Sequence, residues 1–110
     1  YFKLPEIYSN TKTAWLAFPL VIKKNNKFNR KQLQIFFEKN KIQTRTIFTG
    51  NILKQPIMKN LRYKKHSKSQ SVSNDVMENG ILIGCHQGLK YIDLLNITKV
   101  FKKFVKYKSL

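Results

Sequence analysis

The chain has 110 residues, enough for one small domain with a single hydrophobic core and too few for a large enclosed active site. Its net charge of +17 would suit a polyanionic partner, but 19 of its 22 basic residues are lysines scattered among many Asn and Ile residues, whereas nucleic-acid surfaces draw heavily on arginine. A single cysteine and the lack of any apolar run near roughly 18 residues exclude an internal disulfide, a cysteine-rich zinc site and a membrane span, and fit a reducing cytoplasm.

Two segments of different character open the chain. Residues 1–13 are largely polar, and we expect an entry linker there, followed by one small domain over residues 14–110. The apolar run Ala14–Ile22 (AWLAFPLVI) predicts a buried strand. Pro19 within it indicates an edge position or a bulge, because proline cannot donate a backbone hydrogen bond to a neighbouring strand.

An amphipathic helix is expected next. Asn29 and Gln32 have the spacing of a capping box, in which each side chain accepts a hydrogen bond from the other residue's backbone N–H. Leu33, Phe36 and Phe37 then fall on one helical face, which predicts a helix of about 10 to 12 residues packed on the core.

The most informative stretch is TRTIFTGNILKQP, which starts at Thr44. Arg45–Phe48 predicts a short strand, and Gly50 with Asn51 tolerates the backbone angles of a sharp turn. A one-turn element that carries Gln55 follows and ends at a proline. Polar side chains just beyond a strand are often ligand contacts in α/β proteins, so we expect a binding site here.

A basic, Ser-rich segment covers residues 59–74. It has too few apolar side chains to bury itself, and we expect a mobile loop. Ser73 has the position of an N-cap for a short helix through Glu78, and Asn79 with Gly80 should end that helix.

The last part of the chain predicts a strand, a turn and the longest helix. The strand is Ile81–Gly84 (ILIG), His86 lies in the turn, and the helix runs from Lys90 to about Lys106. Its expected apolar stripe consists of Tyr91, Leu94, Leu95, Phe101, Phe104 and Val105. The order of elements predicts an α/β (α+β) fold, a small two-layer sandwich of a roughly three-stranded sheet with helices on one face.

Two strings of residues occur in a fixed order along the chain. The first consists of Thr44, Arg45, Phe48, Gly50, Asn51, Gln55 and Pro56. The second consists of Ile83, Gly84, Cys85, His86, Gly88 and Leu89. Together they resemble the C-terminal domain of the vitamin B6-dependent sugar aminotransferases of the DegT and StrS type, and are most similar to the branch that dehydrates nucleotide-linked 4-keto-6-deoxyhexoses at C3.

The resemblance implies a C-terminal small domain that closes one side of an active site dependent on pyridoxal or pyridoxamine phosphate (PLP or PMP). Such an enzyme would act on a nucleotide-linked keto-deoxy sugar in polysaccharide or lipopolysaccharide biosynthesis. It would either remove the C3 hydroxyl group or transfer an amino group to the ketone. The implied partners are the large N-terminal domain of the same parent chain and a second copy in a homodimer.

The resemblance also places the catalytic residues elsewhere in the parent chain. The family keeps the Schiff-base lysine (a histidine in the dehydratase branch), the acidic partner of the pyridinium nitrogen and the phosphate cradle in its large domain. None of the 19 lysines here falls in a matching motif. We therefore expect this chain to be catalytically inactive by itself.

Four residues are candidates for substrate contacts. Arg45 offers a planar guanidinium to a phosphate or carboxylate. Asn51 and Gln55 offer amides to sugar hydroxyls, and His86 could touch the substrate or move a proton. The structural alternatives are an ion pair for Arg45, a turn and a cap for the two amides, and a plain surface position for His86. Cys85 has no activating partner in the sequence and fits a small buried residue better than a nucleophile.

Two other functions are open on the sequence alone. A small basic nucleic-acid-binding module would account for the net charge of +17, and it would require lysines clustered on one face of the fold. A structural fragment that has lost its partner would also explain a folded chain without catalytic residues.

Overall fold

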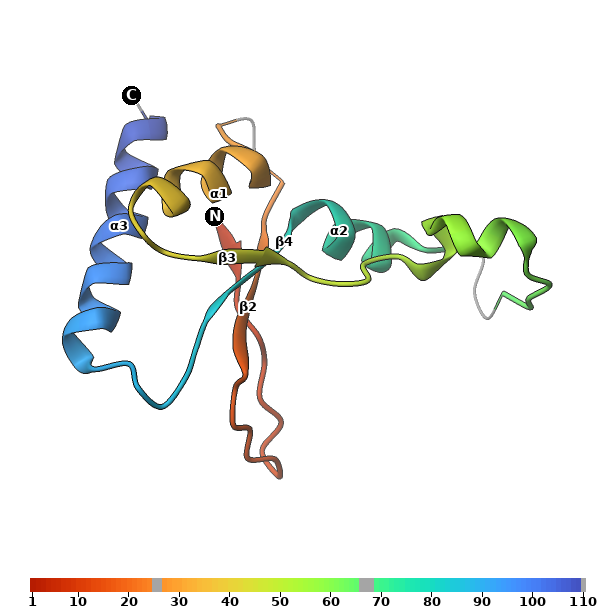
Figure 1. Ribbon diagram of the computed structural model, residues 1–110, viewed down its shortest axis with the longest axis horizontal. Helices are drawn as coiled ribbons and strands as arrows, with labels where there is room; N and C mark the ends of the chain where they lie inside the picture. Colours follow the sequence, from red (N-terminus) through yellow and green to blue (C-terminus); the bar gives the residue numbers. More distant parts are fainter. Residues whose placement is uncertain (25–26, 66–68, 110) are drawn as a thin grey trace.

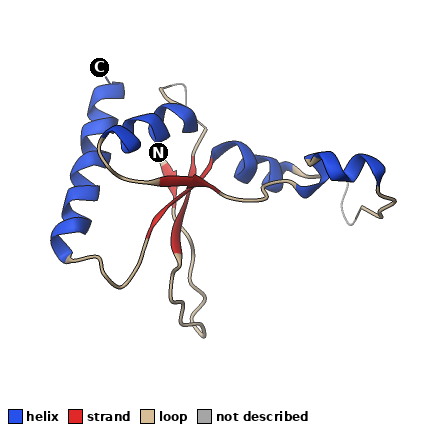
Figure 2. Ribbon diagram, viewed as in Figure 1, coloured by secondary structure: helices blue, strands red, loops and turns tan. Residues whose placement is uncertain are grey.

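A four-stranded antiparallel sheet lies at the centre of the computed structural model, which describes residues 1–24, 27–65 and 69–109. Its strands are β1 (Phe2–Lys3), β2 (Ala17–Ile22), β3 (Thr44–Thr46) and β4 (Gly80–Gly84), in the spatial order β1-β2-β4-β3. The helices are α1 (Arg30–Lys39), α2 (Ser71–Asn79) and α3 (Tyr91–Ser109), and two 3-10 helices, η1 (Ile52–Lys54) and η2 (Pro56–Asn60), lie between β3 and α2 (Figure 1, Figure 2). The predicted α/β class is confirmed, as is the predicted order of elements from β2 to α3.

Helices α1 and α3 lie together over one face of the sheet and bury the core against it (Figure 1). The buried hydrophobic residues are Leu20, Ile22, Phe28, Leu33, Phe37, Ile81, Ile83 and Phe104. Aromatic rings fill much of this layer, with the Phe37 and Phe101 centroids 4.5 Å apart in an edge-to-face arrangement. Such ring pairs contribute about 0.5–1.5 kcal/mol beyond the area that they bury.

Strand β1 lies inside the segment expected to be an entry linker. Phe2 pairs with Ile22 and Lys3 with Val21, and the Phe2 ring packs edge-to-face on Phe101 with centroids 5.2 Å apart. The sheet therefore has one strand more than the sequence predicts. Two residues are too few to show an alternating pattern, so only the tertiary packing of Phe2 reveals this strand.

Pro19 is accommodated by the short length of β1. Strand β2 pairs with β4 along its length, and Pro19 lies opposite Leu82. On the other side β1 reaches only Val21 and Ile22, so Pro19 has no strand neighbour there among the described residues. Pro19 thus has a paired strand on one side only, as at a sheet edge, although β2 is a central strand of the sheet.

Helix α1 has the predicted N-terminal cap. The Gln32 N–H donates to Asn29 Oδ1 and the Asn29 N–H donates to Gln32 Oε1, each over 3.0 Å. At the other end the N–H groups of Lys41 and Ile42 donate to the carbonyls of Glu38 and Phe37, the hydrogen bonds of a Schellman motif. Lys41 takes the left-handed position of this motif, with φ 61°, where glycine is usual.

Helix α2 starts earlier than predicted. Its first residue is Ser71, so Ser73 lies inside the helix, and its N-cap residue Gln70 makes no side-chain capping bond. The Gln70 side chain instead accepts a hydrogen bond from Asn51, as does that of Asn74. The prediction of a Ser73 cap was wrong because a tertiary contact, and not a local cap, fixes where this helix begins.

Helix α3 turns only part of the predicted apolar stripe to the core. Phe104 is fully buried, and Ile97, Val100 and Phe101 pack against the core. At the start of the helix, however, Tyr91 is 75% exposed, and Leu94 and Leu95 are exposed as well. Leu94 borders an apolar pocket beside Leu89 and Ile97, so the first turns of α3 cover the core only in part.

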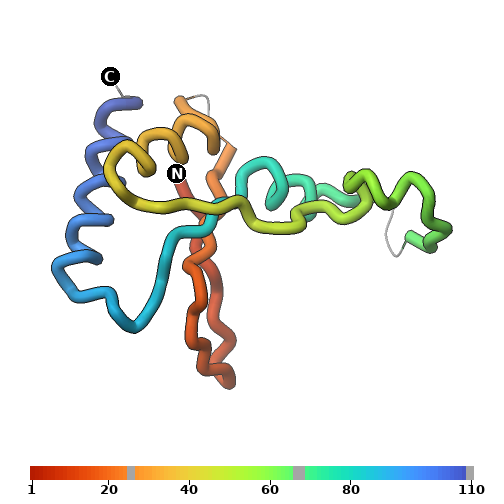
Figure 3. Tube along the Cα trace, in the orientation of Figure 1, coloured from red at the N-terminus to blue at the C-terminus, as the bar shows by residue number. Residues whose placement is uncertain are grey.

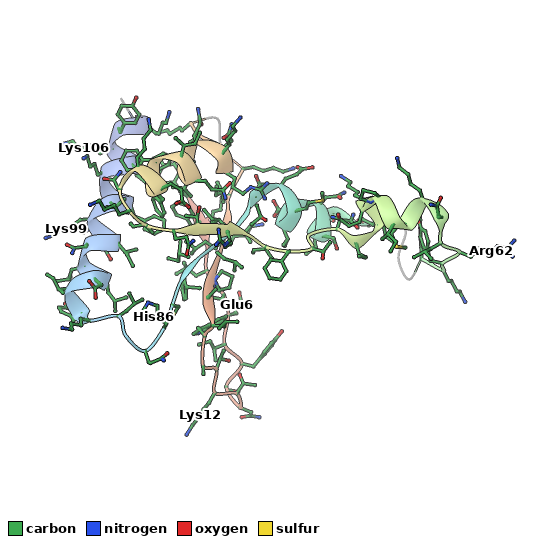
Figure 4. The ribbon with its side chains drawn as sticks, viewed as in Figure 1. Glu6, Lys12, Arg62, His86, Lys99 and Lys106 are labelled. Atoms are coloured by element: carbon green, nitrogen blue, oxygen red, sulfur yellow. The ribbon has the colours of Figure 1, made fainter. Side chains whose placement is uncertain are left out.

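Two segments project from the sandwich (Figure 3). One is the chain between β1 and β2, and the other is an arm that carries η1 and η2, with Arg62 at its far end (Figure 4). The arm includes most of the loop expected to be mobile over residues 59–74, although residues 66–68 lie outside the described residues and its mobility stays a prediction. No helix in the described part of the chain is both long and apolar enough to span a bilayer.

Candidate functional site

The Gly50–Asn51 turn is packed tightly against α2. Gly50 has φ +70°, and a Cβ atom built on it would lie 2.7 Å from the Met77 side chain. A residue with a side chain would therefore be strained by its backbone angle and would also collide with α2. The sharp turn predicted at Gly50 is confirmed, and glycine is required there for two separate reasons.

Asn51 uses its whole amide inside the protein. The residue is only 2% exposed, its Oδ1 accepts from the Leu53 N–H over 3.0 Å, and its Nδ2 donates to Gln70 Oε1 and Asn74 Oδ1 over 2.9 Å each. Both amide hydrogens are thus engaged. Asn51 is a structural residue that ties η1 to α2, and no donor is left for a sugar hydroxyl.

Gln55 closes the same turn from the other side. Its Nε2 donates to the Thr49 carbonyl over 3.0 Å, and the side chain is half-buried. Gln55 thereby sets the backbone path between β3 and η2. It differs from Asn51 in keeping part of its amide at the surface.

Arg45 lies in the middle of β3 and points away from the core. Its neighbour Thr44 is buried, and side chains alternate along a strand, so Arg45 faces the side of the sheet opposite α1 and α3. Thr44 is held there by Glu38, whose Oε1 accepts from both the Thr44 N–H and its hydroxyl over 2.7 and 2.9 Å. Arg45 itself is exposed, and no acidic side chain in the described part of the chain pairs with it.

His86 lies at the other end of the sheet, in the predicted turn after β4 (Figure 4). Its Nδ1 accepts from the Gly88 N–H over 3.1 Å, which leaves Nε2 toward the surface. The ring borders a shallow pocket of about 430 Å³ whose polar lining includes Lys41, Asp93 and Asn96. This pocket includes none of the other three predicted contact residues.

The four predicted residues do not form one site within this chain. Strands β3 and β4 are antiparallel, with Thr44 opposite Ile83 and Thr46 opposite Ile81. Asn51 therefore follows one end of the strand pair and His86 follows the other. From Ile81 to Gly84 the strand advances by three residue steps, about 10 Å at about 3.3 Å per residue, and His86 lies two residues beyond its end. Antiparallel pairing therefore places candidate substrate contacts at opposite ends of the strand pair.

Arg45 has apolar neighbours that the sequence analysis did not single out. It lies opposite Leu82, and Leu82 lies opposite Pro19, so the three form one row across the sheet. A signal for this row is present in the sequence, because AFPLVI and ILIG are unbroken apolar runs. Such runs are typical of strands covered on both faces, whereas a half-exposed strand alternates.

Arg30 is a second arginine whose role only the structure shows. From the start of α1 its Nη1 donates to the Met77 carbonyl and, over 3.3 Å, to the Gly80 carbonyl. It thereby satisfies carbonyls at the junction of α2 and β4. Arg30 is a structural residue, which leaves Arg45 as the arginine of the sheet that is available to a ligand.

The lysines are distributed over most of the molecule. They occur in β1, α1, η1, η2, the arm and α3, as well as in loops. The densest group is on the outer side of α3, where Lys99, Lys102, Lys103 and Lys106 follow one another at helical spacing. Figure 4 shows Lys99 and Lys106 projecting away from the sheet, on the side opposite the core.

One carboxyl group has a clearly shifted titration. Asp75 of α2 accepts a hydrogen bond from Asn79 over 2.7 Å and forms an ion pair with Lys3 of β1 over 2.9 Å. Both interactions favour the carboxylate and hold the pKa of Asp75 below its ordinary value. This contact joins α2 to the strand at the edge of the sheet.

The chain matches the model of the DegT/DnrJ/EryC1/StrS aminotransferase family over residues 2–102. It belongs to this family. Among curated relatives, it is 29% identical over 104 residues to the lipopolysaccharide biosynthesis protein RfbH of Salmonella typhimurium. The matched segment covers 94% of this chain and 24% of RfbH. The sequence-based resemblance is thereby confirmed.

Two solved structures of the family have the same fold. The E. coli GDP-4-keto-6-deoxy-D-mannose-3-dehydratase with bound hydrated PLP matches 91% of this chain and 25% of its own, with a TM-score of 0.80 and 27% identity. A GDP-4-keto-6-deoxymannose-3-dehydratase with a trapped PLP-glutamate geminal diamine matches 88% of this chain and 25% of its own, with a TM-score of 0.72 and 29% identity. The chain thus spans about a quarter of the length of these relatives.

The family depends on PLP, but the described residues of this chain do not form a PLP site. A PLP site needs a carboxylate for the pyridinium nitrogen, close to a lysine or histidine. Here Glu38 is bonded to Thr44, Asp75 to Lys3 and Asn79, and Asp93 of the His86 pocket to the Lys90 N–H over 2.8 Å. These three carboxylates are engaged in holding the fold, and the other two, Glu6 and Glu78, are exposed, so no catalytic step is assigned to this chain.

Proposed function

We propose that this chain is the C-terminal, substrate-closing domain of a PLP- or PMP-dependent enzyme that acts on a nucleotide-linked keto-deoxy sugar. The observation that carries the proposal is the family match over nearly the whole chain, combined with a span of only a quarter of each relative. The cofactor site would then belong to a large domain supplied by the rest of the parent chain. The isolated chain is expected to be inactive, because it contains no cofactor site among its described residues.

The relatives favour one reaction of the two that the family carries out. Both solved structures are named 3-dehydratases of a GDP-linked 4-keto-6-deoxymannose, which supports removal of a C3 hydroxyl group over transfer of an amino group. The RfbH match supports a role in lipopolysaccharide biosynthesis. A cytoplasmic, homodimeric parent enzyme completes the proposal.

Within this chain, Arg45 is the residue best suited to contact the substrate. It is exposed on the face of the sheet that α1 and α3 leave open, and it is not neutralised by an acidic partner among the described residues. A guanidinium in this position can bind the diphosphate of a nucleotide-linked sugar through two parallel hydrogen bonds. Gln55 and His86 are further candidates at opposite ends of the β3–β4 pair, whereas Asn51 acts by holding the turn.

The nucleic-acid alternative requires lysines gathered on one face. Apart from the five on α3, the described lysines are spread over the other elements and loops. This distribution supports the view that the net charge reflects background composition, as the excess of lysine over arginine also indicates.

The experiment that tests the proposal is an arginine substitution in the full-length parent enzyme. Arg45→Ala should raise the dissociation constant for the nucleotide-linked sugar at least about tenfold, or about 1.4 kcal/mol, measured by isothermal titration calorimetry. Arg62→Ala is the matched control, because Arg62 is also exposed but lies at the far end of the arm (Figure 4). If Arg45→Ala weakens binding of the nucleotide-linked sugar no more than Arg62→Ala does, Arg45 is an ordinary surface charge. The proposed site then loses its main residue.

A further inference from the structure

The outward side of α3 changes character along the helix. Residues three or four positions apart share one face of a helix, and the face turned away from the sheet consists of Ile92, Leu95, Lys99, Lys102 and Lys106. Phe104, which is fully buried, marks the opposite side. Figure 4 shows Lys99 and Lys106 projecting away from the rest of the molecule. The outward side is thus apolar in its first half and basic in its second half.

The basic half carries a group of positive charges without acidic partners. It consists of four exposed residues, the α3 lysines: Lys99, Lys102, Lys103 and Lys106. In the described part of the chain none of them forms an ion pair, and the acidic residue of the helix, Asp93, accepts a hydrogen bond from the Lys90 N–H at its start. At about 1.5 Å per residue, the α3 lysines lie within about 11 Å along the helix axis. Like charges held this close attract an anionic surface.

The apolar half lies beside an apolar pocket. At the first turns of α3, Tyr91, Ile92 and Leu94 are 75%, 54% and 50% exposed. The pocket has a volume of about 540 Å³, and Leu4 in its lining is 65% exposed. The Thr98 hydroxyl on its wall already donates to the Leu94 carbonyl over 2.9 Å, so the pocket suits hydrocarbon better than a polar ligand. Exposed apolar side chains gathered in this way mark an interaction surface.

An anionic lipid bilayer offers both chemistries side by side. Its headgroup phosphates suit the α3 lysines, and the hydrocarbon just below them suits the exposed apolar side chains. Long lysine side chains can reach headgroups from a helix that lies partly below them. Nucleic acid would neutralise the lysines but would leave Ile92 and Leu95 in water, and it is commonly bound through arginine. A second copy of this chain would bring the same net charge of +17 and would be repelled.

We propose that α3 docks on the surface of an anionic lipid bilayer. Its first turns, which carry Ile92 and Leu95, insert among the acyl chains, and the α3 lysines contact headgroup phosphates along the rest of the helix. The pocket beside Leu94 receives the end of an acyl chain. The contact involves one leaflet, because the core of the fold packs on the other side of α3. This interaction goes beyond the proposed function, since neither a cofactor nor a sugar takes part in it.

Co-sedimentation of the full-length protein with lipid vesicles tests the proposal. Vesicles that contain about one-third phosphatidylglycerol are compared with vesicles of pure phosphatidylcholine at the same salt concentration. The main variant carries Lys99→Gln and Lys102→Gln. Its matched control carries Lys59→Gln and Lys64→Gln, which remove the same charge from exposed positions on the arm. A further variant with Lys99→Arg and Lys102→Arg keeps the charge and should bind as the unmodified protein does.

We expect the full-length protein to bind the anionic vesicles at least about tenfold more tightly than the neutral ones. Lys99→Gln with Lys102→Gln should weaken this binding about 30-fold, because each lysine near such a surface contributes about fivefold. The arm variant should keep its binding within about twofold. Equal weakening by the two variants would show that only the overall charge acts, and would overturn the proposal. Binding to anionic vesicles no tighter than to neutral ones would overturn it as well.

A change in the apolar half separates a membrane from nucleic acid. Ile92→Gln keeps every charge but removes an apolar side chain from the inserted turns, so it should weaken binding to the anionic vesicles at least about fivefold. Unchanged vesicle binding in Ile92→Gln would overturn the proposal. Duplex DNA in the same buffer is the comparison ligand. If the protein binds DNA more tightly than the vesicles, and only the change at Lys99 and Lys102 weakens that binding, nucleic acid is the occupant and the proposal is overturned.

Discussion

Replacing Gly50 by alanine should destabilise the domain more than an ordinary glycine substitution. The φ angle of +70° costs a residue with a side chain about 1–2 kcal/mol. The new Cβ would also lie 2.7 Å from Met77 Cβ and Cγ and 3.0 Å from its Cα, so the backbone of α2 has to move. That movement weakens the hydrogen bonds from Asn51 to Gln70 and Asn74, each of which contributes about 1 kcal/mol.

The free energy of unfolding should therefore fall by about 2–4 kcal/mol in Gly50→Ala. The measurement is urea denaturation followed by circular dichroism, with the same denaturant slope expected for both proteins. Gly84→Ala is the matched control, because a Cβ at Gly84 meets nothing within 4 Å and its backbone angles are open to any residue. It should leave stability within about 0.5 kcal/mol of the wild type or raise it slightly. A Gly50→Ala variant as stable as Gly84→Ala would refute the argument that the turn and α2 are packed against each other.

Two further predictions concern the ends of α1 and α2. Lys41→Gly should stabilise the domain by about 1 kcal/mol, because glycine adopts the left-handed φ of 61° without strain. Lys39→Gly, at the last residue of α1, places glycine in a right-handed helical position and should instead destabilise the domain; both variants are measured by urea denaturation. The contribution of Asp75 to stability should be complete above its ordinary pKa of 3.8 and should be lost as the pH falls through the lowered pKa, since protonation removes the interactions with Asn79 and Lys3. Asp75→Asn should remove this part of the pH dependence below about pH 4, and an unchanged stability profile would show that the ion pair adds nothing.

Local signals in the sequence were sufficient for most of the elements. The capping box of Asn29 and Gln32, the turn at Gly50 and the apolar run of β4 are each encoded by residues a few positions apart. Such features depend on backbone preferences and on neighbours along the chain, which the sequence displays directly. The family resemblance rested on the same short strings and was confirmed by the comparison with known proteins.

Contacts between distant parts of the chain decided the rest. The two-residue strand β1 exists because the Phe2 ring packs on Phe101, and α2 begins at Ser71 because Asn51 engages Gln70 and Asn74. No local pattern contains these contacts.

The sequence by itself determined the fold class and the family, and it identified Arg45 as a candidate. Only the tertiary structure decided which of the candidate residues are available to a ligand. Antiparallel pairing of β3 and β4 places His86 at the end of the strand pair opposite Asn51. The Asn51 amide is buried and is hydrogen-bonded within the protein. The physical reason is that a side chain's type is fixed by the sequence, whereas its exposure and hydrogen-bond partners depend on which distant segments pack around it.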